Sequence, residues 1–507
     1  MKKKSTYPLK IVRALLAVML FIPVLALFLD FADVLPDALC SILHLQLMPA
    51  ILSGAGGLLV FFFLLTLLFG RIYCSVLCPA GILQDIFNRL ACFGAKKKRG
   101  AMRFHYHKPA NWLRYVILSV TALAAVFGYM ELCLLLDPYS NFGRIATQLF
   151  RPVVIGLNNL ISGILTAHGN YFLYTVSVDR SMTALVTAAI AFIIFAVMAF
   201  YRGRMFCNTI CPVGSLLSII SRYSLFRFKI DSDTCNGCKA CERSCKAEAI
   251  DSQHKTVDMS ICVACFNCIS SCSRGAIGFK QGKVGGNGGK LGVSRRSFIR
   301  TGVAVAGSVP FVALAQGENT TARKAPVTPP GSLNLERFKK FCTGCHLCVV
   351  HCPSHVLKPA GLDFGWGYLL KPHMSYDKSY CNYSCTVCGE ICPTHAIKTI
   401  TVEQKKVTQM GVAHFDRDKC VVKTDETDCG ACVEHCPMQA VHMVPYKGIL
   451  TIPKVEKELC IGCGACESIC PVRPERAIVV IANTIHQTAE LQPEEEMQKV
   501  ELDNFGF

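Results

Sequence analysis

Cysteine spacing is the first feature of this sequence that suggests chemistry. Twenty-four of its 31 cysteines fall into six groups of four, and four of these groups read C-x2-C-x2-C-x3-C. Three closely spaced thiolates followed by a fourth after a longer gap are typical ligands of a [4Fe-4S] cluster. Zinc sites usually take separated pairs of cysteines, and disulfide frameworks belong to small secreted chains. We therefore predict six [4Fe-4S] clusters.

The first two groups are neighbours in the sequence. They are Cys235, Cys238, Cys241, Cys245 and Cys262, Cys265, Cys268, Cys272. In bacterial ferredoxins the fourth cysteine of one run ligates the other cluster. We therefore expect Cys272 to complete the first group of three and Cys245 to complete the second.

Four further groups fill the last third of the chain, and each ends in Cys-Pro. They are Cys342, Cys345, Cys348, Cys352; Cys381, Cys385, Cys388, Cys392; Cys420, Cys429, Cys432, Cys436; and Cys460, Cys463, Cys466, Cys470. The second and third have a longer first gap. Fourth ligands could be exchanged between neighbouring groups or between the first group and the last.

A second cysteine pattern occurs twice outside these groups. Residues 70–81 and 203–214 both read G-R-x-x-C-x-x-x-C-P-x-G and contain Cys74, Cys78, Cys207 and Cys211. Cysteines four apart lie on one face of a helix. The two pairs could together supply four thiolates to an extra cluster or metal ion, or act as a thiol–disulfide couple. They could also be buried free thiols in a duplicated turn.

The surrounding sequence predicts an α-helical membrane bundle. Hydrophobic residues make up 52% of the chain and charged residues 17%, which is too apolar for an ordinary soluble protein. Four apolar runs, about 11–29, 50–69, 113–136 and 182–201, are long enough to cross the ~30 Å hydrocarbon core. Lys and Arg cluster before the first run and after the second and fourth. By the positive-inside rule, both ends of this bundle are cytoplasmic.

Charge and missing motifs exclude several function classes. Residues 1–315 carry 33 Lys/Arg and 13 Asp/Glu, whereas residues 316–507 carry 20 and 22. The basic excess therefore belongs to the apolar part, as in a membrane protein, and we expect no nucleic-acid partner. No histidine falls inside the four runs, so we expect no haem. The sequence shows no dinucleotide loop and no phosphate-binding loop.

An export signal is predicted in the middle of the chain. A glycine-rich linker leads to Ser294-Arg295-Arg296-Ser297-Phe298, a short apolar stretch and Ala313-Leu314-Ala315. This is the pattern of a twin-arginine signal, a route that carries folded proteins. If it is not cleaved, 301–315 becomes a fifth, short anchor.

These features predict four regions. A four-span domain with the two C-x-x-x-C-P motifs occupies 1–229, and a cytoplasmic α+β ferredoxin occupies 230–280. The linker and signal occupy 281–315, and an exported α+β polyferredoxin occupies 316–507.

Both halves resemble known ferredoxin-type proteins. Residues 1–280, with four spans, two C-x-x-x-C-P motifs and a two-cluster ferredoxin, are similar to the membrane polyferredoxin of periplasmic nitrate reductase systems (NapH-like). Residues 290–490 resemble its twin-arginine-exported partner with four [4Fe-4S] clusters (NapG-like), and the methylamine-utilisation ferredoxins are similar too. The resemblance implies a fusion in the inner membrane that oxidises quinol and delivers electrons to a periplasmic reductase or electron carrier.

The sequence features and the resemblance are compatible with two functions from different classes. The first is a quinol-oxidising electron-transfer protein, a subunit of a larger oxidoreductase system rather than a complete enzyme. The second is a maturation or redox-regulatory factor for a periplasmic metalloenzyme, in which the C-x-x-x-C motifs work as thiols. A terminal reductase ranks last, because the sequence offers no catalytic cofactor site.

Overall fold

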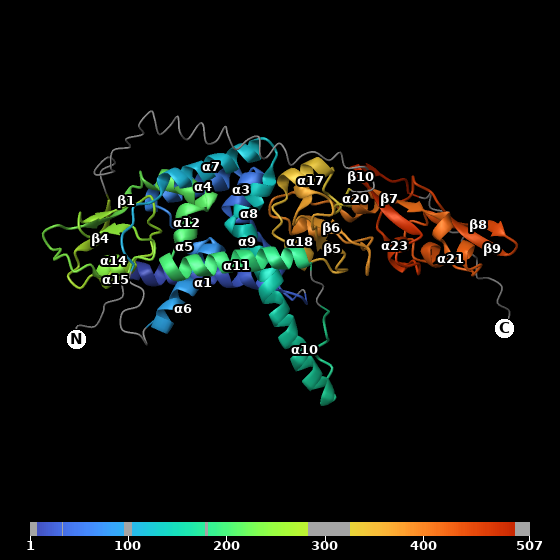
Figure 1. Cartoon of the computed structure of the whole chain (residues 1–507), viewed down its shortest axis with the longest axis horizontal. Coiled ribbons are helices and arrows are strands. Elements are labelled where there is room, and N and C mark those ends of the chain that lie inside the picture. The colour runs from blue at the N-terminus through green and yellow to red at the C-terminus, as the bar shows by residue number, and fades with distance from the viewer. Residues whose placement is uncertain (1–7, 33, 96–103, 178–180, 282–324, 492–507) are drawn as a thin grey trace, which may run out of the picture.

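The computed structural model describes residues 8–32, 34–95, 104–177, 181–281 and 325–491. Figure 1 shows three parts along the long axis: a small α+β part at one end, a helical bundle in the middle, and a larger α+β part at the other end. The predicted linker, twin-arginine signal and fifth anchor (281–315) lie outside the described residues, except Gln281.

The helical bundle runs from residue 8 to residue 221. Its helices are α1 (Pro8–Leu29), η1 (Asp37–Cys40), α2 (Ser41–His44), α3 (Leu47–Ser53), α4 (Gly56–Phe69), α5 (Tyr73–Val76), α6 (Pro79–Ala95), α7 (Asn111–Val126), α8 (Met130–Leu136), α9 (Pro138–Ile145), η2 (Ala146–Phe150), α10 (Arg151–Ala167), α11 (Met182–Arg202), α12 (Met205–Thr209) and α13 (Pro212–Ser221). Within the described residues, three helical stretches are long and apolar enough to cross a membrane: Pro8–Leu29, Pro138–Ala167 and Met182–Arg202.

Two of the four predicted spans are not single helices. The run 50–69 is broken between α3 and α4, where Gly54 has a φ of +72°. The run 113–136 is broken between α7 and α8 by Gly128, with a φ of +87°. Both glycines adopt the left-handed conformation that ends a helix. Hydropathy alone cannot detect such breaks, because glycine does not lower it much.

None of the four predicted spans falls within 137–181, but the first part of this segment is helical. α9, η2 and α10 form one continuous helix, Pro138–Ala167, with a mean hydropathy of 1.4, against 2.5 for α11. Polar residues such as Asn141, Arg144 and Asn158 interrupt its apolar pattern and hid it from the sequence analysis. Its η2 segment is a π-helix.

The small α+β part follows the bundle directly. It contains β1 (Phe226–Ile230), α14 (Ala240–Arg243), β2 (Ile250–Asp251), β3 (Thr256–Val257), α15 (Asn267–Ser271) and β4 (Ile277–Gln281). β1 pairs antiparallel with β4, and β2 with β3. The short helices follow turns in which Lys239 and Phe266 have positive φ.

The larger α+β part is built from short elements around its cysteines. They are α17 (Leu335–Phe341), α18 (Leu347–Val350), β5 (Leu357–Pro359), η5 (Trp366–Tyr368), β6 (Pro372–Met374), α19 (Val387–Glu390), α20 (Val402–Val407), β7 (Thr408–Phe415), η6 (Arg417–Lys419), α21 (Val421–Thr424), α22 (Ala431–Glu434), β8 (Val441–Lys447), β9 (Leu450–Val455), α23 (Ala465–Ile469) and β10 (Ile478–Thr488). Three antiparallel pairs, β5–β6, β7–β10 and β8–β9, hold it together.

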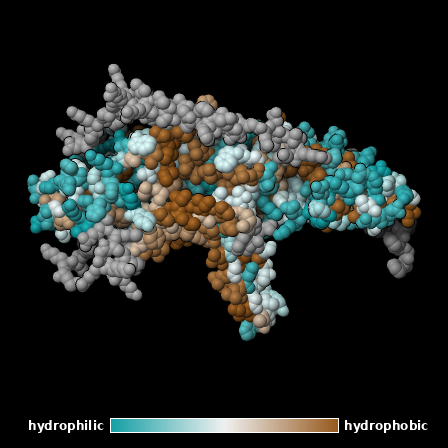
Figure 2. Space-filling model, in the orientation of Figure 1, coloured by the Kyte–Doolittle hydropathy of each residue, from teal (hydrophilic) through white to brown (hydrophobic). Residues whose placement is uncertain are grey.

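Surface hydropathy divides the molecule in the same way. Figure 2 shows a hydrophobic band over the helices, with hydrophilic surfaces at both ends. Large apolar side chains on the outer faces of α1, α4, α10 and α11 are exposed, including Met19, Phe61, Leu160 and Ile193. Such a belt would be unfavourable in water and suits a lipid environment.

The larger α+β part packs directly onto the bundle. Lys371, 1% exposed, forms an ion pair with Glu131 of α8, with its Nζ 3.2 Å from Oε1. His351 Nε2 lies 2.9 Å from the backbone oxygen of Leu27, and Arg151 donates to the backbone oxygen of Val350 at 3.2 Å. A side chain on Gly143 of α9 would meet the backbone oxygen of Cys345. This junction therefore brings a cysteine group against the helices.

Replacing Lys371 with Met should destabilise the junction, because it leaves the carboxylate of Glu131 buried without its cation. Breaking a buried ion pair from one side costs about 3–5 kcal/mol. Thermal unfolding in detergent should therefore move to a lower temperature. The double variant Lys371→Met/Glu131→Leu is the control, and it should recover most of the loss. A single variant as stable as the wild type would contradict this role of the pair.

Candidate functional site

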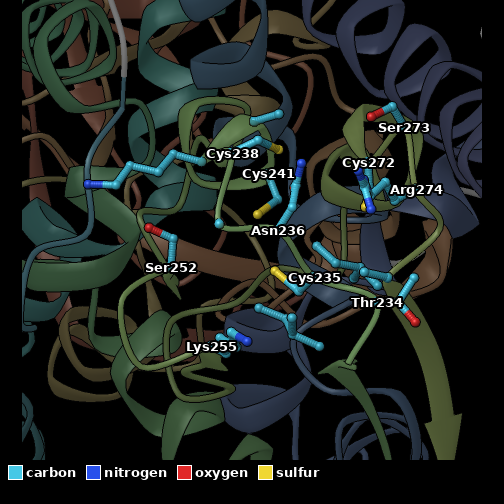
Figure 3. Close-up of a pocket in the computed structure, with 16 residues that line it drawn as sticks. Thr234, Cys235, Asn236, Cys238, Cys241, Ser252, Lys255, Cys272, Ser273 and Arg274 are labelled. Carbon is cyan, nitrogen blue, oxygen red and sulfur yellow. The ribbon is translucent and has the colours of Figure 1, made fainter. Parts of the chain in front are cut away.

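The eight cysteines of the small α+β part form two groups in the crossed arrangement that the spacing suggests. Cys235, Cys238, Cys241 and Cys272 line one cavity, which Figure 3 shows with the four side chains around a common space. A second cavity is lined by Cys245, Cys262, Cys265 and Cys268, together with apolar residues such as Phe228. Each group of three therefore lies with the fourth cysteine of the other run.

The first two groups of the larger part are crossed in the same way. Burial raises the pKa of Cys345 to about 12, and Cys392 is the charged neighbour that contributes most to this shift. Conversely, the charge of Cys352 acts on Cys381, Cys385 and Cys388. The fourth cysteines of the runs at 342 and 381 have thus changed places.

The last two groups also exchange their fourth cysteines. Cys436 lines a cavity with Cys460, Cys463 and Cys466. Cys470 in turn acts on Cys420 and Cys432. Of the alternatives left open by the sequence, the structure has exchange between neighbouring groups and not between first and last.

These six groups fit [4Fe-4S] clusters. The donors are thiols alone, four to a group, and three of the groups surround cavities that the protein does not fill. Among the described residues, no three His, Cys, Asp or Glu side chains converge as they would on a single metal ion. Ligands of a cubane must stand farther apart than that, because each thiolate binds a different iron.

The four cysteines of the C-x-x-x-C-P motifs are brought together in the bundle. Cys74 and Cys78 lie in and just after α5, and Cys207 and Cys211 in and just after α12. All four are only 2–3% exposed. The charge of Cys78 acts on Cys211, and that of Cys207 acts on both Cys78 and Cys211. Two distant repeats therefore create one buried four-cysteine site.

Each repeat sends its arginine across to the other repeat. Arg71 donates from Nη2 to the backbone oxygen of Cys207 at 2.9 Å. Arg204 donates from Nη1 to the backbone oxygen of Cys74. The shared G-R-x-x-C spacing thus encodes a reciprocal contact, and the two turns are related by approximate two-fold symmetry.

The last glycine of each repeat is required by close packing. A Cβ on Gly81 would meet the backbone oxygen of Cys74, and a Cβ on Gly214 would meet that of Cys207. The added atom would also stand 2.9 Å and 2.7 Å, respectively, from the guanidinium of the opposing arginine. These glycines let a helix start directly beneath the cysteine turn.

Positive charge accumulates around the four-cysteine site. Arg71, Arg114 and Arg204 are at most 1% exposed, and Arg13 and Lys246 are 7% and 6% exposed. Asp85 pairs with Arg204 at 2.7 Å, with Lys246, and with Arg13 at 3.8 Å.

The buried cations differ in how they are balanced. Burial alone would raise the pKa of Asp85, but Arg204 and Lys246 hold it below its usual range. Within the described residues, no salt bridge joins Arg71 or Arg114 to a carboxylate, and both donate to the backbone oxygen of Ser260. Buried cations are costly unless an anion balances them.

The four-cysteine site lies between the two α+β parts. Asn208 donates to the backbone oxygen of Ala247, two residues after Cys245. On the other side, Tyr73 lies near Cys74 and Cys78, and the buried Tyr139 lies near Tyr73, Cys345 and Cys392. A continuous packed path therefore connects the cysteine groups at the two ends of the molecule.

Several residues of this site escaped the sequence analysis. Arg13, Asp85, Arg114, Tyr139 and Lys246 belong to no spacing pattern, and only folding brings them to the cysteines. Arg71 and Arg204 stood inside the repeated motif, and their identical position in both copies was the available signal.

Comparison with known families supports iron–sulfur binding. A family described as "4Fe-4S binding domain" matches residues 52–100 and 183–232, the two segments that contain the C-x-x-x-C-P motifs. Another 4Fe-4S binding domain matches 228–251, and a "4Fe-4S dicluster domain" matches 427–473. No solved structure matches the chain.

Individual relatives are ferredoxin-type proteins. The chain is 32% identical to the methylamine utilization ferredoxin-type protein MauM of Methylobacillus flagellatus over 36% of this chain and 79% of the relative. It is 30% identical to the ferredoxin-type protein NapG of Escherichia coli over 37% and 85%, respectively. An uncharacterized protein of Methanocaldococcus jannaschii is 28% identical, and the match covers 41% of this chain and 64% of that relative.

Replacing Gly81 or Gly214 with Ala should disrupt the four-cysteine site, because the new methyl group would collide with the backbone oxygen of the cysteine turn in its own repeat and with the arginine from the other repeat. We expect a lower temperature of unfolding in detergent and a loss of iron. Gly57→Ala is the matched control, since no atom lies within 4 Å of its added Cβ and it stands in a helix. Alanine favours helix there by up to about 1 kcal/mol. Equal behaviour of the three variants would count against the packing argument.

Proposed function

Because the chain belongs to the family of ferredoxin-type proteins that includes NapG and MauM, we propose that it is an inner-membrane protein that carries electrons from quinol to a periplasmic reductase or electron carrier. Its iron–sulfur and electron-transfer character follows from this family and from the 4Fe-4S domains. The apolar helices and the hydrophobic belt support membrane insertion with several crossings. We propose quinol as the electron donor.

The proposed arrangement places the two α+β parts on opposite sides of the membrane. Residues 1–229 form the membrane domain, 230–280 the cytoplasmic ferredoxin, 281–315 the linker with its twin-arginine signal, and 316–507 the periplasmic polyferredoxin. The two α+β parts at opposite ends of the belt support this assignment. Basic residues at the end of the bundle near the small part also support it, since Lys and Arg mark the cytoplasmic side.

The six crossed cysteine groups would each hold a [4Fe-4S] cluster, and the four-cysteine site would hold a seventh iron–sulfur centre. A centre bound by four thiolates carries negative charge, which the unpaired guanidinium groups of Arg71 and Arg114 can balance. The cluster supplies one-electron redox chemistry. The surrounding residues would hold the cysteine ligands in position and exclude water from the cluster. Their charge would adjust the reduction potential of the cluster.

The observation that carries this proposal is the position of the four-cysteine site. Cys74, Cys78, Cys207 and Cys211 lie between the backbone next to Cys245 and the Tyr73–Tyr139 pair that leads to Cys345. Without a centre here, the hydrocarbon core of ~30 Å would separate the two sets of clusters. With it, electrons can cross the bundle in shorter steps.

The alternative role as a thiol-based maturation factor is less well supported. Exchange with a partner protein needs an accessible thiolate, whereas the four cysteines are 2–3% exposed. Among the described residues, their neighbours are side chains and backbone of the same chain, such as Gln84, whose Nε2 lies 3.3 Å from the sulfur of Cys207.

Removing two ligands from the four-cysteine site should break the connection between the two sides. In Cys207→Ser/Cys211→Ser, iron should fall by about four atoms per chain. When less reductant is added than is needed to reduce every cluster, the added electrons should no longer distribute over the clusters of both sides. EPR measures this distribution. Cys133→Ser is the control, because Cys133 is also buried in the bundle but belongs to no group. Unchanged iron content in the double variant would refute a seventh centre.

Quinol oxidation is tested on the purified full chain. Menadiol, a short naphthoquinol, is added anaerobically to the oxidised protein in detergent, and cluster bleaching is followed by absorbance and EPR. We expect menadiol to reduce the clusters fast enough to support catalytic turnover. If menadiol leaves the clusters oxidised while dithionite reduces them all, quinol is not the donor, and the maturation role becomes the better proposal.

A further inference from the structure

A cavity of about 410 Å³ lies at the junction between the bundle and the larger α+β part. Leu52 and Ser53 at the end of α3 form one wall. The other walls come from α17, through Arg337 and Phe341, and from the segment after Cys392, through Thr394, His395 and Lys398. Its volume is within the range of small-molecule sites, about 300–1,000 Å³.

The cavity lies next to one of the cysteine groups, separated from it by lining residues. Phe341 precedes Cys342, and the hydroxyl of Thr394 lies 3.6 Å from the sulfur of Cys392. Cys342 and Cys392 belong to the same crossed group. A ring molecule in the cavity would therefore be separated from this group by little more than one side chain.

The cavity also opens beside apolar helix surface. Ile51 on α3 is 40% exposed, and Phe61 and Leu64 on α4 are 54% and 52% exposed. In a bilayer these side chains face lipid. A molecule with a polar head and an apolar tail could thus place its head in the cavity and its tail along α4.

Cationic and hydrogen-bonding groups line the polar side of the cavity. His395 is exposed toward the cavity, and its ring lies 5.7 Å from that of His44 on α2. The Arg337 guanidinium donates to the backbone oxygens of His395 and Ala396 and stacks over Phe341. Lys398 completes the basic lining.

From this combination we propose that the cavity is the quinol-binding site, an inference that rests on the proposed function and locates its entry point. A quinol bound there releases two electrons and two protons and leaves as the quinone. Cys342, Cys345, Cys348 and Cys392 would hold the iron–sulfur cluster that accepts these electrons one at a time. The two protons are released to water at the open side of the cavity. Electrons from quinol therefore enter at the large α+β end, and the four-cysteine site would connect this entry point with the cytoplasmic ferredoxin.

Direct binding is tested without electron transfer. An azido-naphthoquinone is photolysed with the purified full chain, and labelled peptides are identified by mass spectrometry. We expect label on the peptides that contain the lining residues, at 52–53, 337–341 or 394–399, and competition by menadione. Label confined to peptides elsewhere would overturn the site, even if quinol still reduces the protein.

Variants test the site through kinetics. Leu52→Trp fills the cavity and should raise the menadiol concentration for half-maximal reduction rate at least tenfold. Leu68→Trp, at the far end of α4 and also exposed to lipid, is the control. Dithionite should reduce every variant fully.

The outcomes separate the two proposals. Unchanged menadiol kinetics in Leu52→Trp, or a larger effect of Leu68→Trp, would overturn the site alone. A wild-type chain that is labelled at the cavity but not reduced by menadiol would overturn quinol oxidation and leave the binding site standing.

Discussion

The crossed contact of Arg71 and Arg204 holds the centre of this protein together. Each guanidinium leaves its own turn and donates to the backbone oxygen of a cysteine in the other repeat. Hydrogen bonds from charged donors contribute about 1.5–3 kcal/mol each, but the burial of these cations is itself costly. Asp85 balances Arg204, whereas no carboxylate among the described residues forms a salt bridge with Arg71. Thiolates bound to a cluster or metal would supply the anion that Arg71 lacks, and this would couple the packing of the helices to whatever the cysteines bind.

The approximate symmetry of the site ends at its periphery. Asp85 in one half corresponds to Ser218 in the other, and Asn208 corresponds to Ser75. The half with Asp85 attracts Arg204, Lys246 and Arg13, whereas Asn208 and Arg71 bond to the backbone of the ferredoxin part. The duplicated turn thus supplies four equivalent cysteines. The residues that differ between the two copies attach this site to the ferredoxin part. A surplus of nearby positive charge also favours the reduced form of a thiolate-bound cluster.

Spacing could predict which cysteines belong together wherever the ligands are local. The crossing of Cys245 with Cys272 was predicted from the run itself, but exchange between the groups at 342 and 381 needed the fold, because several exchanges satisfy the same spacing. Hydropathy found α1 and α11 correctly. It failed at Gly54 and Gly128, where single residues break helices, and at 138–167, where Asn and Arg side chains that bond within the protein look like loop residues in the sequence. Arg114 and Lys246 could not be found at all, since only tertiary packing gives them a partner.

The ferredoxin part forms the floor of the four-cysteine site. The backbone amide of Arg204 donates to the backbone oxygen of Lys246 at 2.9 Å, and a side chain on Gly203 would collide with the same oxygen. Once this floor is in place, the thiols have almost no surface left. An inorganic group in the site would therefore have to be inserted before residues 226–281 pack against the helices. The centre in the bundle would then mature before the ferredoxin part covers it.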